Sequence, residues 1–349
     1  MPQIHERRRA ALAARLPAPA ALITRLVNVR YLTGLASSHA AVLVFADGRA
    51  VLATDARYAG TAAAVAPDLE LLVTPHVAAE LVDRAGGEVA FEAHDITVED
   101  HAALFENVRA VPLGRLVEEL RTVKDEEEIA LLRRACALTD RTFGLVLPKI
   151  APGVTEKEIA RALERGMVDL GADGPAFASI VASGPNGAVP HHVAGDRPVA
   201  DGDLVTMDFG ALVEGYHADM TRTVAVGSVA GWQREIYGLV AEAQAAAVAA
   251  CLPDAAVPDV DAAARDVIKA GGHAADFTHG LGHGVGLEIH EAPMLGPTRT
   301  GRLTDRVPVT AEPGVYLAGR GGVRIEDTLV VRAGGPELLT QTTKELLVL

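Results

Sequence analysis

The stretch Asp203–Val226 reads DLVTMDFGALVEGYHADMTRTVAV, two β-rich runs on either side of a turn at Glu214-Gly215. This pattern predicts a β-hairpin. Each run carries one acid where an apolar residue would be expected, Asp208 and Asp219. Because side chains alternate faces along a strand, registers that place Asp208 opposite Asp219 or Thr221 put both acids on one face. Carboxylates that close repel unless a proton or a cation lies between them. On the hairpin alone, two solvated acids remain the simpler interpretation.

Length and composition limit the class of protein. A chain of 349 residues is long for a single core, so we expect two domains. The net charge of -14 argues against nucleic acid as the main partner, because phosphate binding needs basic patches. The two cysteines, Cys136 and Cys251, have no metal-type spacing and suit a reducing compartment. No apolar run approaches the length of a membrane span, so we expect no membrane association.

The N-terminus is rich in arginine, and Glu6 is its only acid before Asp47. Twin-arginine signals and transit peptides share this composition. However, Arg15 interrupts the apolar stretch, and prolines follow directly after it. An amphipathic helix over residues 4–16 accounts for the same pattern more simply. We therefore predict a cytoplasmic protein.

The domain boundary is expected near Pro112-Leu113-Gly114, and we assign residues 1–118 and 119–349 to the two domains. The first domain combines short strands (42–45, 49–53, 69–73 and 88–91) with short helices (57–65 and 98–105). In the second, capping patterns at Asp125 and Thr155 predict helices that reach about residue 147 and end before residue 171. Further helices fit 235–250 and 259–270. Helices alternate with antiparallel strands, so the fold class is α+β.

A second group of polar residues lies in Thr278–Glu291, THGLGHGVGLEIHE. Its four glycines argue against a helix, so we place its histidines on a loop or irregular strand. Glycine lets the backbone approach a bound group closely, and His283 and His290 can then line one cavity. A glycine- and histidine-rich surface loop is an equally good interpretation of this segment alone.

Two further carboxylates complete the candidate set. Glu312 ends a β-like run and is followed by Pro313-Gly314, and Glu326 lies in a strand predicted over Gly322–Val331. On that strand Arg324 and Glu326 share one face by the period of two, whereas the competing acid Asp327 falls on the apolar face.

Charge then suggests what the cluster binds. Four carboxylates carry four negative charges, which two divalent cations would neutralise, while a single cation would leave a costly buried net charge. Oxygen-rich ligation with one imidazole favours Mn²⁺ before Zn²⁺, with Co²⁺ and Fe²⁺ as alternatives. The lack of cysteine ligands argues against a structural zinc site.

The segments DFG…HADMTRT, HGLGHGVGLEIHE, AEPGVY and VRIEDT together resemble the pita-bread metallopeptidases, in particular the Xaa-Pro branch of aminopeptidase P and prolidase. Ser183–Pro198, SGPNGAVPHHVAGDRP, resembles the substrate-histidine loop of that branch. VRYLTGL at Val29–Leu35 and LATDARY at Leu52–Tyr58 resemble its smaller, creatinase-like N-terminal domain. The resemblance implies a creatinase-like α/β domain followed by a pita-bread domain with an antiparallel sheet and flanking helices.

The resemblance also implies roles for single residues. The five metal ligands would be Asp208, Asp219, His283, Glu312 and Glu326, with Asp219 and Glu326 bridging two ions. The substrate-loop histidine falls on His191, with His192 kept as an alternative. Active-site histidines outside the metal shell fall on His279 and His290, and Arg324 matches an arginine that orients carboxylates. We interpret His192 and His217 as ordinary polar surface histidines.

Two-metal chemistry would activate a water molecule for attack on the scissile carbonyl. His191 or His290 would donate a hydrogen bond to the developing oxyanion, and Glu312 would carry the proton to the leaving nitrogen. Because that nitrogen belongs to a proline ring and has no N–H, polarisation of the carbonyl by a metal is well suited to an Xaa-Pro bond.

The sequence therefore predicts a dinuclear-metal exopeptidase that acts on proline-containing peptides. We favour an Xaa-Pro aminopeptidase, with an Xaa-Pro dipeptidase, which must recognise the carboxylate directly after proline, as the alternative. Methionine aminopeptidase lacks the extra N-terminal domain and the His191 loop, and a creatinase-like hydrolase lacks the metal ligands. An inactive scaffold of the same fold is the alternative of another class. The family implies a homodimer.

Overall fold

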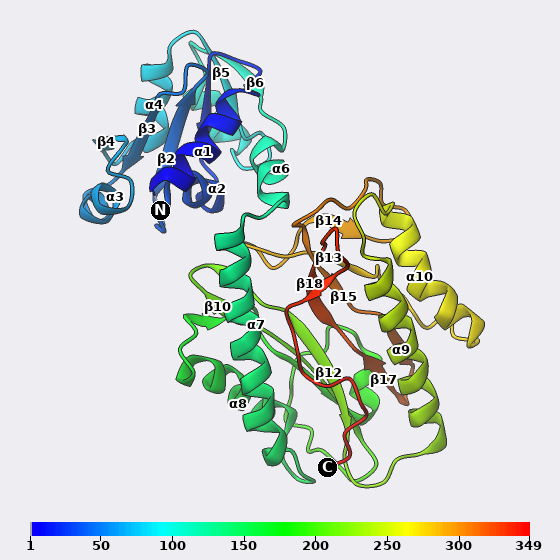
Figure 1. Ribbon diagram of the computed structural model, residues 1–349. Coiled ribbons are helices and arrows are strands. Elements are labelled where there is room, and N and C mark those ends of the chain that lie inside the picture. Colours follow the sequence, from blue (N-terminus) through cyan, green and yellow to red (C-terminus); the bar gives the residue numbers. More distant parts are fainter. Residues whose placement is uncertain (1) are drawn as a thin grey trace. The chain divides into compact units, whose positions relative to one another are not determined.

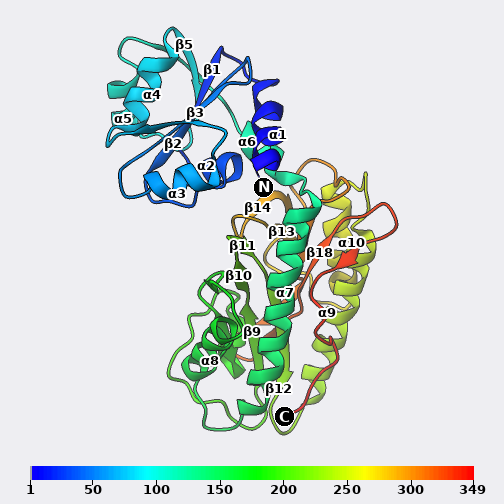
Figure 2. The same ribbon diagram turned by 60° about the vertical axis from the view of Figure 1, so that its left-hand side comes forward.

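The computed structural model describes residues 2–349 and separates into two compact units, one ending at Arg121 and one spanning Thr122–Leu349. Figure 1 shows the elements of both units in chain order, and Figure 2 shows them from a second direction. None of the helices within residues 2–349 is long and apolar enough to cross a membrane.

The first unit is built on a mixed six-stranded sheet. The strand order is β4-β3-β2-β1-β5-β6, with parallel pairs β3/β4, β1/β5 and β5/β6. The strands are β1 (Ala20–Ile23), β2 (Ala40–Phe45), β3 (Ala50–Thr54), β4 (Glu70–Val73), β5 (Glu88–Phe91) and β6 (Arg109–Pro112). The helices are α1 (Pro2–Ala13), α2 (Leu26–Thr33), α3 (Ala59–Val65), α4 (Val77–Ala85), α5 (Val98–Leu104) and α6 (Leu116–Thr122).

The central strands of this sheet are apolar on both faces. Alternate residues of β1 and β2, such as Leu22 and Leu43, join the core under α4, while α1 and α2 contact β2. All four residues of β1 are buried. This burial explains why β1 and β2 read as continuous apolar runs rather than as alternating ones.

The second unit places helix pairs around small antiparallel sheets. Helix α7 (Glu126–Val146) is followed by η1 (Leu147–Lys149) and α8 (Glu156–Asp169), and the predicted capping boxes at Asp125 and Thr155 are both confirmed. The other two helices are α9 (Gly231–Ala250), which begins four residues before its predicted start, and α10 (Val257–Ala270). Helix α7 contacts α8 and β10, whereas α9 and α10 pack against each other and against strands later in the chain (Figure 1).

The strands of the second unit form four sheets, in the orders β11-β10-β7, β12-β9-β8, β14-β13-β15-β18-β19 and β16-β17. Their bounds are β7 (Gly174–Pro175), β8 (Ile180–Ser183), β9 (Leu204–Phe209), β10 (Ala211–Val213), β11 (Tyr216–His217), β12 (Met220–Ala225), β13 (Gly282–Gly284), β14 (Glu291–Leu295), β15 (Pro308–Ala311), β16 (Gly314–Leu317), β17 (Gly321–Arg324), β18 (Asp327–Val330) and β19 (Glu337–Leu338). A short 3-10 helix, η2 (Gly184–Ala188), follows β8.

The predicted hairpin forms, but neither of its arms is one continuous strand. The turn is as expected, with φ of 48° at Glu214 and 80° at Gly215. The first arm breaks at Gly210, where a Cβ atom would lie 1.7 Å from the carbonyl oxygen of Ala218. The two arms therefore approach each other so closely that only glycine fits.

A second correction concerns the strand predicted over Gly322–Val331. The structure has two strands there, β17 and β18, and Ile325 and Glu326 lie between them. The backbone N–H of Glu326 donates to the carbonyl of Thr221 in β12 (3.1 Å). This bond draws Glu326 toward the hairpin, which explains the break.

Candidate metal centre and substrate pocket

The hairpin brings its two aspartates together. Asp208 lies near the end of β9 and is paired with Thr221 of β12, one of the two registers expected from the sequence. Asp219 directly precedes β12 and is almost completely buried. Both side chains line the same cavity of about 410 Å³.

His283 and Glu312 reach this cavity from neighbouring strands. His283 lies at a register shift in β13, and Glu312 follows directly after β15, which pairs with β13. Atom Nδ1 of His283 lies 3.0 Å from the carbonyl oxygen of Gly284, which suits an Nδ1–H donor. Atom Nε2 then faces the carboxylates, 3.5 Å from both Asp219 Oδ2 and Glu312 Oε1.

Glu326 completes the group from the segment between β17 and β18. One ligand atom each of Asp219, His283 and Glu326 lies within 4.8 Å of the others. Oxygen Oε2 of Glu326 accepts a hydrogen bond from Thr221 (2.7 Å), but its Oε1 has no partner within residues 2–349. The same holds for Oδ1 of Asp208 and Oδ1 of Asp219. Buried polar atoms rarely lack partners, so three of them converging on one cavity indicate an additional ligand.

Burial and mutual repulsion shift the pKa values of these groups. Burial first, and then the neighbouring carboxylates, raise the pKa of Asp219 and of Glu326 well above the usual values. Burial raises the pKa of Glu312 to about 8 and lowers the pKa of His283 to about 4. Carboxylates with raised pKa values and a neutral imidazole crowded together in one buried site are typical of a functional centre, and a nearby cation would favour ionisation of the acids.

The residues present fit a pair of divalent metal ions. Four carboxylates and one neutral imidazole supply hard oxygen ligands with a single nitrogen, and the three residues with unsatisfied oxygens all line the same cavity. A cation between them would satisfy these atoms and remove the repulsion.

Arg324 supports this centre without entering the cavity. Its guanidinium donates to Asp208 Oδ2 (2.7 Å), to the hydroxyl of Thr221 (3.1 Å) and to that of Tyr316 (3.0 Å). The Tyr316 hydroxyl in turn lies 2.8 Å from Nε2 of His279. These bonds orient one carboxylate and one histidine at the cavity wall.

The three other expected histidines, His191, His279 and His290, also line the cavity. His290 packs edge-on against His283, with ring centroids 4.4 Å apart. Burial lowers the pKa of His279 to about 4, so that imidazole is neutral at physiological pH. The structure thus brings every expected site residue to the cavity wall except Arg324, which does not line the cavity but contacts Asp208.

Three residues that the sequence left in doubt lie outside the cavity. Asp327 is buried among Arg222, Gln244 and Lys344, which agrees with the face assigned to it. His192 and His217 were expected to be surface histidines, but both are half-buried. His192 contacts the buried Glu156, and His217 lies 3.0 Å from the carbonyl oxygen of Gly286. Both contacts join distant parts of the chain, which no local pattern reveals.

Sequence reasoning also missed part of the cavity wall. Its apolar side includes Phe177, Ile180, Ile289, Met294 and Leu295. Arg299 lines it as well, and is the only arginine or lysine that does so in the part of the chain that the structure describes. Its side chain is exposed, packs over Gly296, and forms no hydrogen bond or ion pair with residues 2–349.

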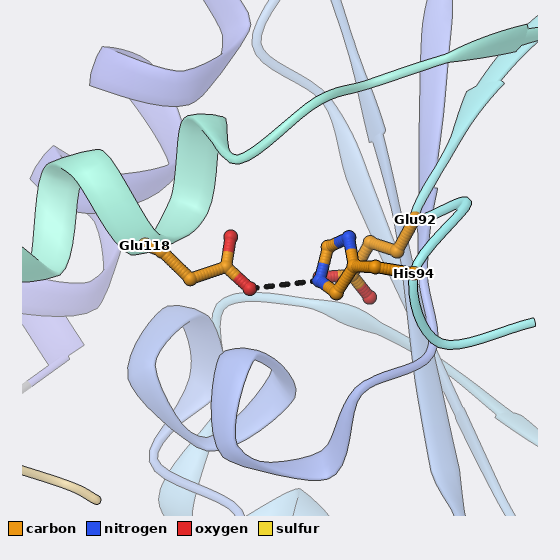
Figure 3. Close-up of side chains that lie close together, drawn as sticks. All are labelled: Glu92, His94 and Glu118. Carbon is orange, nitrogen blue, oxygen red and sulfur yellow. Dashed lines mark hydrogen bonds and ion pairs between the residues drawn. The ribbon is translucent and has the colours of Figure 1, made fainter. Parts of the chain in front are cut away.

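A second group of ligand-type side chains lies in the first unit and consists of Glu92, His94 and Glu118 (Figure 3). Glu92 accepts from the backbone N–H groups of Thr24 and Arg25 (both 2.8 Å) and from Asn28. Glu118 accepts from the guanidinium of Arg25 and lies 2.8 Å from His94 Nε2. Donors therefore already face these carboxylates, so we interpret this group as a structural hub.

Comparison with known proteins matches a different family model to each of the two units of the chain. Residues 6–123 match the creatinase/prolidase N-terminal domain, and residues 130–333 match metallopeptidase family M24. An Xaa-Pro dipeptidase of Pyrococcus furiosus is 44% identical over 232 residues, which cover 66% of this chain and 67% of that protein.

Two solved structures are similar over nearly the whole chain. The Xaa-Pro dipeptidase from Bacillus anthracis is 36% identical, with a TM-score of 0.95 and complete coverage of both chains. The X-Pro aminopeptidase from Thermotoga maritima is 32% identical, with a TM-score of 0.90 and coverage of 97% of this chain and 99% of that one. The creatinase-like domain followed by a pita-bread domain is thus confirmed, and the chain belongs to metallopeptidase family M24.

Proposed function

We propose that the protein is an Xaa-Pro dipeptidase. The observation that carries this choice is Arg299, the one guanidinium that lines the cavity among residues 2–349, beside carboxylates, histidines and apolar side chains. In a dipeptide the free carboxylate directly follows the proline ring, so an arginine at the cavity wall is suited to bind it. The similarity to proteins named Xaa-Pro dipeptidase supports the same choice over the aminopeptidase favoured from the sequence alone.

An Xaa-Pro aminopeptidase is the second candidate. The structure of the Thermotoga maritima X-Pro aminopeptidase is nearly as similar as that of the dipeptidase. Arg299 is also exposed, so a longer peptide would have room to pass beside it.

Members of this family depend on a dinuclear metal centre. Asp208, Asp219, His283, Glu312 and Glu326 would hold the ions, for which we propose Mn²⁺. When bound, the ions would polarise the scissile carbonyl and supply an activated water molecule.

The chain's own residues perform the remaining tasks. His191 and His290 line the cavity and would donate hydrogen bonds to the developing oxyanion. Glu312 would carry a proton from the attacking water to the leaving nitrogen. Arg324 keeps Asp208 in one orientation, and the apolar wall around Ile180 would receive the proline ring and exclude water.

Three further expectations complete the proposal. We propose that the protein acts in the cytoplasm, as its two buried free cysteines suggest, and that it forms a homodimer, as expected from the family resemblance. We also propose that the five ligand positions make it an active enzyme rather than a scaffold of the same fold.

Hydrolysis of Ala-Pro and Ala-Pro-Pro by metal-stripped protein resupplied with Mn²⁺ tests the assignment. We expect cleavage of the dipeptide, and no cleavage of either peptide by Asp208→Asn. Arg299→Ala should lower kcat/KM for Ala-Pro about 10- to 100-fold, the loss expected for one charge-assisted hydrogen bond. It should have little effect on Ala-Pro amide, which lacks the carboxylate.

The outcomes separate the alternatives. Cleavage of the tripeptide with an unaffected Arg299→Ala variant would favour the aminopeptidase. An equal loss on the acid and the amide would show that Arg299 does not bind the carboxylate. Tightly bound metal without cleavage of either peptide would favour the scaffold.

A further inference from the structure

The loop that carries His191 has little regular structure of its own. Between η2, which ends at Ala188, and β9, which begins at Leu204, the structure has no helix and no strand. His191 is exposed, and its ring forms no hydrogen bond with any described residue. Its position at the cavity wall must therefore be set by the residues on either side of it.

One buried carboxylate accepts hydrogen bonds from this loop and from the residues that precede it. Glu156 is the first residue of α8, and its side chain is fully buried. Oxygen Oε1 accepts from the backbone and the hydroxyl of Ser183 (2.7 and 2.8 Å) and from Asn186 (2.9 Å). Oxygen Oε2 lies 2.8 Å from Nε2 of His192 and accepts from the backbone N–H of Gly195 (3.2 Å). The acceptor capacity of the carboxylate is thus directed at residues 183–195, which run from the end of β8 through η2 into the loop that carries His191.

The contacts of Glu156 suit an ionised carboxylate. Burial alone would raise its pKa, but the hydrogen bonds from Asn186, Ser183 and His192 outweigh burial, and the pKa lies below its usual value. Donors from Ser183 to Gly195 satisfy this buried anion, which makes the conformation of that segment specific, because any other conformation would leave the charge unpaired.

His191 is held between two such anchors. On its N-terminal side, the carbonyl of Pro190 accepts from the guanidinium of Arg324 (3.3 Å), which also orients Asp208. On its C-terminal side, the ring of His192 is only 20% exposed and reaches Glu156. His191 lies in a turn that is closed by a hydrogen bond from the backbone N–H of His192 to the carbonyl of Val189 (3.2 Å), so fixing the ring of His192 also fixes the turn that presents His191 to the cavity.

We propose that Glu156 and His192 are positioning residues that hold His191 against the substrate. This inference rests on the proposed function, in which His191 contacts the peptide. It also answers the question that the sequence left open, since His191 would serve the substrate while its neighbour serves the loop.

The first test is a double-mutant cycle in the metal-loaded full chain. His192→Ala should lower kcat/KM for Ala-Pro roughly tenfold, because it removes a hydrogen bond to a charged group. In the background of His191→Ala the same change should have almost no effect, since there is no ring left to position. His192→Gln retains a donor for Glu156 and should restore most of the activity. The control Val193→Ala changes an 85% exposed neighbour and should leave activity unaltered.

The second readout does not depend on activity. Amide hydrogen exchange of the peptide covering residues 185–196 should accelerate in His192→Ala and in Glu156→Gln, but not in Val193→Ala. Unchanged exchange in both variants, or an equal loss of kcat/KM with and without His191, would overturn the proposal. If the wild-type protein cleaves no Xaa-Pro peptide, the proposed function fails, and hydrogen exchange still decides whether Glu156 and His192 hold the loop.

Discussion

Replacing Arg222 by methionine should strongly destabilise the second unit. Arg222 lies in β12 with its side chain 2% exposed, and its Nη2 donates to Oδ1 of the fully buried Asp327 (2.7 Å). The same guanidinium donates to the backbone carbonyls of Thr221, Glu326, Thr342 and Thr343. Methionine fills much of the volume but supplies no donor, so these acceptors would lose their shared partner.

Removing one member of a buried ion pair costs about 3–5 kcal/mol. Asp327 keeps Lys344 as a second cation (2.6 Å), so much of the cost here comes from the buried backbone carbonyls that lose their donor. With a urea m-value of about 3 kcal/mol/M, this corresponds to a fall of about 1 to 1.7 M in the unfolding midpoint. Arg134 provides a matched control, since its Nη1 also lies 2.7 Å from a carboxylate, that of Glu214, but both side chains are at least half exposed. Arg134→Met should therefore cost less than about 1 kcal/mol.

Urea unfolding of the metal-loaded protein, followed by tryptophan fluorescence, measures both effects. The only tryptophan, Trp232, lies in α9 and reports on the second unit. A loss in Arg222→Met no larger than that in Arg134→Met would refute the argument that burial sets the strength of the pair. Arg222→Lys should recover only part of the stability, because an ammonium group cannot reach all five acceptors.

Three further predictions concern other parts of the chain. Burial raises the pKa of Glu92 to about 7, so the stability that protonated Glu92 contributes is fully present below pH 4.5 and is lost as the pH rises through 7. The opening free energies of the β1 amides, measured by hydrogen exchange, should therefore fall by about 3 kcal/mol over this range. In Glu92→Gln they should not change with pH. Gly210→Ala should distort the hairpin and lower metal content and activity, whereas Gly144→Ala, with open space around it in α7, should be neutral or slightly stabilising in urea unfolding. Chelation of divalent ions should lower the urea midpoint, and resupply of Mn²⁺ at 100 times its Kd should restore about 2.7 kcal/mol per site; an unchanged midpoint would contradict the metal assignment.

The expected metal ligands shared one property, since each is an acid or a histidine in a stretch whose other residues are typical of strands and close turns. Asp208 and Asp219 were visible because polar residues break a β-rich pattern, and the hairpin turn fixed their register to within two residues. Glu326 was visible for the same reason, although its strand is broken. Local rules suffice where the turn or the strand period itself brings side chains together.

No local sequence pattern pointed to Glu156 or Arg299 as functional residues. Glu156 follows the capping residue Thr155, and acids are common in the first turn of a helix, so its position had a sufficient local explanation. Its actual partners lie 27 to 39 residues away along the chain. Arg299 lies in a segment of glycine, proline and threonine that predicts only a loop. Contacts made by irregular loops depend on tertiary packing, which periodicity does not encode.

The two groups of ligand-type side chains show what separates a metal centre from a structural hub. Both hold acids and a histidine with ligand atoms within 4.8 Å of one another. In the first unit, backbone N–H groups, Asn28 and Arg25 face the carboxylates of Glu92 and Glu118. In the second unit, one oxygen each of Asp219 and Glu326 meets no donor in the described chain. A cation entering the first group would have to displace donors, whereas one entering the second would satisfy atoms that otherwise destabilise the fold. Proximity alone does not distinguish the two groups, whereas the three donors that face Glu92 and the guanidinium that faces Glu118 identify the first as a structural hub.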